Sequence, residues 1–252
     1  MQRPCPSCGN LPLASSSYRN DPAIQRPNPD IKATMTTTAF PPLTGPLGFY
    51  PVVPTADWVQ RLLGWGVRTI QLRIKAVDHS PAEITAQVQA AVAAGRAVPG
   101  AQVFINDHWK LALAHGAYGV HLGQEDLDTA DIEALRQAGL RLGLSTHTPT
   151  ELARAHAVQP SYLAIGPIYP TTLKVMPYAP VGLEQLAVWA SQAALSPRLP
   201  VVAIGGISLE RLPGVVACLN GPNDGVAVVS AVTLAQDAQW AAGEGMRLAA
   251  SP

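Results

Sequence analysis

The sequence has little charge, and neither sign prevails. Charged residues make up 13% of the 252 residues, and 17 Lys and Arg are balanced by 17 Asp and Glu. Without a basic surplus, neither nucleic acid nor an acidic membrane surface is indicated as a partner. A few local cations can still bind an anionic substrate on a neutral protein, so phosphorylated small molecules stay possible.

Cysteines and long apolar runs are also scarce. Three cysteines, Cys5, Cys8 and Cys218, are too few for a disulfide scaffold and suit a reducing compartment. Cys5 and Cys8 have the spacing of a zinc site, but no second pair follows, so this indication is weak. The longest stretch without charge, 33–56, contains Pro and Thr and does not read as a membrane span. No apolar segment of a secretory signal begins the chain, so we expect a cytoplasmic protein.

Residues 1–46 differ from the rest in composition. They are rich in Pro, Ser, Asn and Thr and have no hydrophobic period, which is typical of a disordered extension. An alternative is that translation starts at Met35. Residues 47–252 form the other predicted unit, a single domain of a length that suits one barrel.

Eight short apolar runs alternate with helical segments. Continuous apolar runs indicate strands that are buried on both faces. The predicted strands are Phe49–Val53, Thr69–Leu72, Gln102–Ile105, Gly119–Leu122, Leu140–Ser145, Tyr162–Ile165, Val201–Ile204 and Gly225–Val229. The predicted helices are Asp57–Leu63, one from Ser80, His108–Ala114, Asp131–Ala138, one from Thr148, Leu183–Ala194, Leu209–Leu219 and Ala231–Leu248. This order predicts an α/β protein with a single (β/α)₈ (TIM) barrel; an open doubly wound sheet would need fewer strands and a G-x-G-x-x-G after the first one, which is missing.

Barrels of this kind carry their active sites at the carboxyl ends of the strands. Gln71, Arg73 and Lys75 alternate along and beyond the second predicted strand, so they share one face. Arginine and lysine at the barrel mouth would bind phosphate oxygens. The alternative is a charged loop that faces solvent.

Acidic residues follow the next two strands. Asp107, and Asp126 or its neighbour Glu125, would reach the same rim. Mg²⁺ is commonly held by one or two carboxylates together with substrate phosphates. The alternatives are a helix cap at Asp107 and a turn role for Asp126.

Later loops add further candidates. Ser145 could donate a hydrogen bond to phosphate, and Thr171 and Lys174 lie on a long loop that could bind an anion. His147 could transfer protons, although a simple loop histidine is the favoured interpretation. Gly205-Gly206 and Ser230 are each predicted to open a helix, where free N–H groups bind phosphate.

Six motifs, taken in order, resemble thiamine-phosphate synthase. The likeness covers roughly residues 47–248. The motifs are Gln71-Leu72-Arg73-Ile74-Lys75, Ile105-Asn106-Asp107, His121-Leu122-Gly123-Gln124-Glu125-Asp126, Ser145-Thr146-His147, Gly166-Pro167-Ile168-Tyr169-Pro170-Thr171 and Ala203-Ile204-Gly205-Gly206-Ile207.

The resemblance implies a transferase that joins an aminopyrimidine pyrophosphate to a thiazole phosphate and releases pyrophosphate, with one Mg²⁺ per site. It implies Asp107 and Asp126 as metal ligands. It implies that the pyrimidine pyrophosphate is bound by Gln71, Arg73, Lys75, Asn106, Ser145 and Lys174, and that Leu72 and Ile74 are further substrate-binding residues. It implies that the thiazole phosphate is bound by Thr171, Thr172, Leu173, Gly206, Val229 and Ser230. Of these, Arg73, Lys75, Ser145 and Lys174 would be catalytic.

Three points stay open beside this resemblance. The alternatives in function are a thiazole tautomerase-like enzyme and a non-catalytic phosphate-binding barrel. A homo-oligomer is possible. The family often has Thr where this chain has Leu173, and the loss of that hydroxyl implies weaker binding of the thiazole phosphate.

Overall fold

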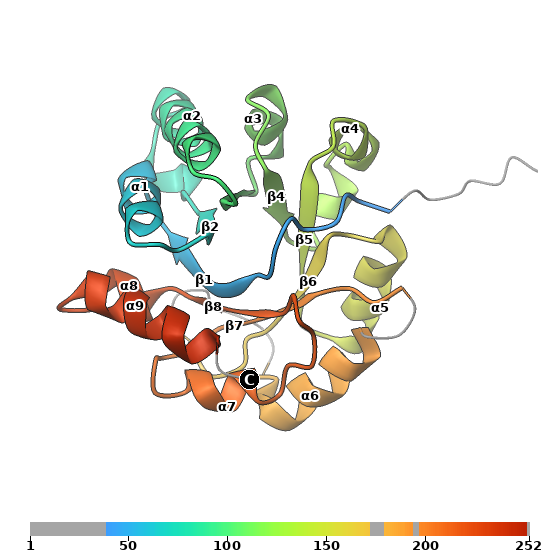
Figure 1. The fold of residues 1–252 in the computed structure, drawn as a ribbon. Helices are drawn as coiled ribbons and strands as arrows, with labels where there is room; N and C mark the ends of the chain where they lie inside the picture. Colours follow the sequence, from blue (N-terminus) through green and yellow to red (C-terminus); the bar gives the residue numbers. More distant parts are fainter. Residues whose placement is uncertain (1–38, 172–178, 194–196, 251–252) are drawn as a thin grey trace, which may run out of the picture. The chain divides into compact units, whose positions relative to one another are not determined.

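Eight parallel strands close into a barrel in which each strand pairs with the next and β8 pairs with β1 (Figure 1). The computed structural model describes residues 39–171, 179–193 and 197–250. The strands are β1 Gly48–Val53, β2 Thr69–Leu72, β3 Gln102–Asn106, β4 Gly119–Leu122, β5 Arg141–Thr146, β6 Tyr162–Ile165, β7 Val201–Ile204 and β8 Gly225–Val228. The helices are α1 Ala56–Gly64, α2 Pro81–Ala97, α3 Trp109–Ala114, α4 Ile132–Gln137, α5 Pro149–Val158, α6 Gly182–Ala193, α7 Leu212–Val216, α8 Ser230–Thr233 and α9 Ala238–Ala249. This arrangement confirms the predicted (β/α)₈ barrel.

The strands follow the predicted pattern closely. β2, β4, β6 and β7 have the predicted bounds, and the other four differ by one residue at one or both ends. The agreement has a local cause, because each run is a short apolar segment bounded by polar or turn residues. Each strand is buried on both faces, as continuous apolar runs imply.

Helix starts depend on capping side chains. At α2 the predicted capping box is complete, since the Ser80 hydroxyl accepts from the N–H of Glu83 and the Glu83 carboxylate accepts from the N–H of Ser80. At α5 only half of the predicted box forms. Thr148 accepts from the N–H of Glu151, but the Glu151 carboxylate accepts from the N–H of His147 instead.

Two predicted helices are wrong in extent. The segment predicted as Leu209–Leu219 is helical only in α7, where Pro213 occupies the first turn, a position that proline tolerates. The segment predicted as Ala231–Leu248 is divided into α8 and α9, because Asp237 accepts from the N–H of Trp240 and so caps a new helix. Within the described residues, no helix is long and apolar enough to cross a membrane.

The barrel interior is filled by aromatic rings that face glycines. Tyr50, Phe104 and Tyr162 contact one another there, with ring centroids 5.1–6.1 Å apart. A Cβ atom on Gly143 would lie 2.1 Å from the Tyr162 Cζ, and one on Gly119 would lie 2.6 Å from the Phe104 Cε1. The absence of side chains on β4 and β5 at these positions therefore makes the space for the rings of β3 and β6.

A segment before β1, residues 39–47, crosses the amino-terminal end of the barrel, where Figure 1 shows it in blue. Phe40 is 4% exposed and its N–H donates to the Gln159 carbonyl. Further along, the Gln102 amide donates to the Pro46 carbonyl. Residues 39–46 thus pack on the barrel although they lie before the predicted boundary at 47, whereas the rest of the predicted extension lies outside the described residues.

Candidate active site

The end of β2 turns one face into the barrel. The Gln71 amide donates to the Tyr50 hydroxyl of β1, so Gln71 faces the barrel interior. Leu72 and Ile74 belong to the hydrophobic core between the strands and the surrounding helices. Arg73 continues the strand pairing, because its N–H donates to the Val53 carbonyl. By alternation its side chain follows Gln71 toward the mouth. Lys75 is exposed and precedes a 3₁₀ turn, η1 (Ala76–Asp78).

Asp107 follows β3 in an unusual backbone conformation. Its φ is 59°, in the left-handed region that Asp tolerates better than most residues. Its N–H donates to the His121 carbonyl of β4. The helix that follows has His108 at its N-cap and no capping side chain, so the helix-cap alternative for Asp107 does not hold. The backbone instead directs this carboxylate onto the rim, where such strained positions often serve function.

Asp126 lies at the start of a second 3₁₀ turn, η2 (Asp126–Asp128), after β4. Its carboxylate accepts from the N–H of Gly123 at 2.8 Å, which is the turn role proposed as an alternative. That bond leaves acceptor capacity on the carboxylate. Asp126 thus has a local structural role and can still face a ligand.

Asp107, Asp126 and Arg73 interact electrostatically at one rim. Desolvation by the surrounding protein raises the pKa of Asp107, and repulsion from Asp126 raises it further. The Arg73 guanidinium opposes this shift and lowers the pKa of Asp107, with help from His108 and a hydrogen bond from Asn106. Strands β2, β3 and β4 therefore deliver two acids and a cation to the same place, as the chain order implied.

Ser145, on β5, is held from two sides. Its hydroxyl lies 2.8 Å from the His121 Nε2, and its carbonyl accepts from the Gln124 amide at 2.7 Å. The side chain is partly exposed at the mouth. A hydroxyl in this position can donate to a phosphate oxygen.

His147 is part of a helix start. Its Nδ1 lies 2.8 Å from the Glu151 carboxylate, which also accepts from the His147 backbone N–H. Since both contacts fix the chain before α5, they favour the interpretation of His147 as a loop histidine over a proton-transfer role.

The loops after β6 and β7 lie against each other. The Ile168 N–H donates to the Ile204 carbonyl, and the Tyr169 N–H donates to the Gly205 carbonyl. Gly206 has a φ of 66°, and a Cβ atom there would lie 2.6 Å from the Pro170 carbonyl oxygen. Only glycine permits this backbone and this approach. Thr171 is the last described residue of the loop; Thr172, Leu173 and Lys174 lie outside the described residues.

The predicted helix start at Gly205-Gly206 is wrong. α7 begins only at Leu212, because Pro213 has to lie in the first turn, and it is five residues long. α8 does begin at Ser230, directly after Val229, but it is four residues long. Phosphate binding by Gly206, Val229 and Ser230 would therefore depend on loop N–H groups and the serine hydroxyl rather than on a helix dipole.

Sequence reasoning missed two residues that lie at or under this rim. His121, which the sequence offered only as part of a motif, is 5% exposed and contacts both Ser145 and Tyr162 through its ring nitrogens. The alternation of side chains along a strand could have indicated this position, because His121 shares a face with Gly119, and Ser145 lies on the neighbouring strand. Arg211 was also missed: it donates to the Gly206 carbonyl and lies 4.5 Å from the Tyr169 ring centroid.

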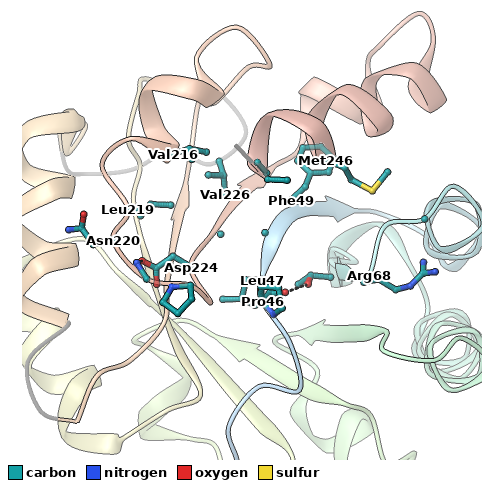
Figure 2. Close-up of a pocket in the computed structure, with 18 residues that line it drawn as sticks. Pro46, Leu47, Phe49, Arg68, Val216, Leu219, Asn220, Asp224, Val226 and Met246 are labelled. Atoms are coloured by element: carbon teal, nitrogen blue, oxygen red, sulfur yellow. Dashed lines mark hydrogen bonds between the residues drawn. The ribbon is translucent and has the colours of Figure 1, made fainter. Parts of the chain in front are cut away.

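A cavity of about 650 Å³ lies at the other end of the barrel. Figure 2 shows Pro46, Leu47 and Arg68 on one side of it and Val216 and Leu219 on the other. Its lining is mostly apolar, and the Asp224 carboxylate there already accepts from the N–H groups of Val201 and Gly221. Because barrel chemistry is located at the carboxyl ends of strands, this cavity is not the candidate active site.

Known proteins resemble the chain along most of its length. A family model described as thiamine monophosphate synthase matches residues 50–232. The thiamine-phosphate synthase of Pectobacterium atrosepticum is 55% identical over 201 residues, which cover 80% of this chain and 91% of that protein. The enzyme of the same name from Klebsiella pneumoniae is 54% identical over 210 residues, covering 83% of this chain and 94% of that protein.

Solved structures share the barrel. The thiamine phosphate pyrophosphorylase from Pyrococcus furiosus superposes with a TM-score of 0.67 at 31% identity, covering 81% of this chain and 95% of that one. A 3-hexulose-6-phosphate synthase superposes with a TM-score of 0.55 at 16% identity, covering 79% of this chain and 98% of that one. At that identity the second likeness concerns the fold alone.

Proposed function

Because the chain belongs to the thiamine monophosphate synthase family, we propose that it condenses an aminopyrimidine pyrophosphate with a thiazole phosphate to form thiamine phosphate and pyrophosphate. The observation that carries the assignment to this site is the convergence of Asp107, Asp126 and Arg73 at one rim. Two acids beside a cation suit a metal-bound diphosphate better than a bare phosphate. The rival functions, a tautomerase-like enzyme or a non-catalytic barrel, do not need this combination.

The two carboxylates fit Mg²⁺. Desolvation, followed by repulsion from Asp126, raises the pKa of Asp107, and a divalent cation held by the two carboxylates would relieve that repulsion. Among the described residues no group of three or more His, Cys, Asp and Glu gathers for a metal. Two carboxylates suffice where substrate oxygens and waters supply the other ligands, which is typical of Mg²⁺. We therefore assign Asp107 and Asp126 as its protein ligands.

The reaction forms a bond from the thiazole nitrogen to the pyrimidine CH₂ carbon and breaks the bond from that carbon to the pyrophosphate oxygen. The departing oxygen takes the bonding electrons. Mg²⁺, when bound, would withdraw negative charge from the pyrophosphate. Arg73, Lys75 and Lys174 would neutralise more of that charge, and Ser145 would donate a hydrogen bond.

No proton has to be removed in this reaction. The thiazole nitrogen attacks with a lone pair, and the electron-rich aminopyrimidine can stabilise a cationic CH₂ group, so a dissociative path is open. A general base is therefore unnecessary. This agrees with the contacts of His147, whose ring is engaged with Glu151.

Pyrophosphate release tests the proposal. The protein would be incubated with both substrates and Mg²⁺, and pyrophosphate and thiamine phosphate would be measured together. We expect the two products in equal amounts, and neither when the thiazole phosphate is omitted. A tautomerase would alter the thiazole without releasing pyrophosphate, and a binding protein would form no product; either result would refute the proposal.

Leu173 allows a prediction about affinity. If a threonine hydroxyl at this position contacts the thiazole phosphate, Leu173→Thr should lower the KM for thiazole phosphate severalfold, since one hydrogen bond contributes about 1 kcal/mol. Leu173→Val, which has the shape of threonine without the hydroxyl, is the matched control. An unchanged KM in Leu173→Thr, measured by initial rates, would count against the contact.

A further inference from the structure

A chain of hydrogen bonds runs through the barrel and links two proposed substrate-binding residues. The Ser145 hydroxyl lies 2.8 Å from the His121 Nε2, and the His121 Nδ1 lies 2.7 Å from the Tyr162 hydroxyl. The Tyr162 hydroxyl lies 2.9 Å from that of Tyr50, which accepts from the Gln71 amide at 3.3 Å. The chain joins strands β5, β4, β6, β1 and β2.

The middle of this hydrogen-bond chain is buried. Tyr50, Tyr162 and His121 are 1%, 0% and 5% exposed. Burial raises the pKa of both phenols well above its ordinary value, so each phenol keeps one proton at neutral pH. A buried group of this kind has to have its donors and acceptors matched.

When every donor in the hydrogen-bond chain is given an acceptor, only one order of donation remains. Tyr50 accepts from Gln71, so its own proton is available to Tyr162. Tyr162 then donates to the His121 Nδ1, which leaves the ring proton on Nε2. In the reverse order Tyr162 would donate to Tyr50, and the Tyr50 proton would have no acceptor among the hydrogen bonds described for it.

We infer that Tyr162 is a positioning residue for Ser145. It accepts from Tyr50, donates to the His121 Nδ1 and so holds the imidazole in the tautomer with its proton on Nε2. That nitrogen donates to the Ser145 oxygen, which leaves the hydroxyl proton of Ser145 to donate into the mouth. The role of this donor toward pyrophosphate rests on the proposed function, whereas the tautomer does not.

The barrel holds the Tyr162 ring in one place. A Cβ atom on Gly143 would lie 2.3 Å from the Tyr162 hydroxyl, so the ring fits only because position 143 has no side chain. The ring stacks on His121, with centroids 5.6 Å apart and 26° between the planes. It also meets Phe104 edge-on at 5.1 Å. A ring so confined can hold its hydrogen-bond partner in one orientation.

The tautomer can be measured without substrate. Protein labelled with ¹⁵N in histidine would be examined by NMR, and the His121 signals assigned as those lost in His121→Asn. We expect one protonated nitrogen, Nε2, in the wild type, and a loss of that single pattern in Tyr162→Phe. A proton on Nδ1, or on both nitrogens, in the wild type would overturn the inference.

Kinetics test the action through Ser145. Tyr162→Phe should lower kcat/KM for the pyrimidine pyrophosphate about fivefold, the factor of one ordinary hydrogen bond, and leave the KM for thiazole phosphate unchanged. In a Ser145→Ala background the same substitution should have little further effect, because the two residues act in series. Additive effects would overturn the inference.

Tyr118→Phe is the matched control for a merely structural loss. The Tyr118 hydroxyl donates to the Gln102 side-chain oxygen at 2.6 Å. This bond lies at the amino-terminal end of the barrel and is not part of the hydrogen-bond chain from Ser145 to Gln71. Thermal unfolding of all variants would show that each folds. We expect Tyr118→Phe to keep wild-type kcat/KM, and an equal loss in both tyrosine variants would contradict the positioning role. If the wild type released no pyrophosphate, the proposed function would fail while the NMR result would still decide the tautomer.

Discussion

Asp107→Ala is expected to lower kcat for pyrophosphate release by about two to three orders of magnitude, the usual effect of removing one electrostatic contact to a developing charge. Asp107 and Asp126 are the proposed Mg²⁺ ligands, and without Asp107 one carboxylate remains beside Arg73. Folding should survive, because Asp107 lies on a loop after β3 and its side chain does not cap the helix that follows. The measurement is kcat at saturating substrates over a range of Mg²⁺ concentrations.

The backbone at Asp107 calls for a second variant. Alanine at a φ of 59° is strained by about 1–2 kcal/mol, so part of any loss in Asp107→Ala could reflect a shifted loop. Asp107→Asn removes the charge and keeps a residue that tolerates this conformation. Near-normal kcat in Asp107→Asn, with normal dependence on Mg²⁺, would remove Asp107 from the metal site.

Asp128→Ala is the control for the loss of an acidic residue that lies near the proposed metal site, on the loop of Asp126, but is not a proposed ligand. Asp128 ends η2, and its carboxylate pairs with Arg154 at 2.6 Å on the surface. Both side chains are well exposed, so the ion pair contributes little to stability. We expect kcat and the dependence on Mg²⁺ to stay as in the wild type.

Lys174→Ala is expected to cause a loss of kcat of the same order. Lys174 itself lies outside the described residues, but the described part of its loop, up to Thr171, lies against Gly206 at the carboxyl end of β7. The family resemblance implies that Lys174 binds the pyrophosphate of the pyrimidine substrate, and we propose that it contacts the departing group. There it would act as a positive point charge on the leaving group.

A charge-conserving variant sharpens this prediction. Lys174→Arg keeps the cation and should retain more activity than Lys174→Ala or Lys174→Gln. Single-turnover rates separate the chemical step from product release. If all three variants turned over normally, neutralisation of the leaving group by Lys174 would be excluded.

The site was partly predictable because barrel topology converts chain order into spatial order. Residues just after β2, β3 and β4 have to meet at one rim, which is why Arg73, Asp107 and Asp126 interact. Phosphate binding after β7 was predicted from a helix start that does not exist there. That error arose because Pro213 delays the helix, so the glycines lie in a loop that packs against its neighbour.

The fold followed from local patterns in the sequence. These patterns are the apolar runs, the caps such as Ser80, and the alternation of strands with helices. Because each is a property of neighbouring residues, the sequence alone determined them. What the tertiary structure decided are contacts between side chains far apart in the chain. Tyr50, His121 and Tyr162 lie on strands that are buried on both faces, where an apolar run does not show which residues point inward. Only closure of the barrel brings these residues together, because strand register and the space left by Gly143 decide which rings can meet.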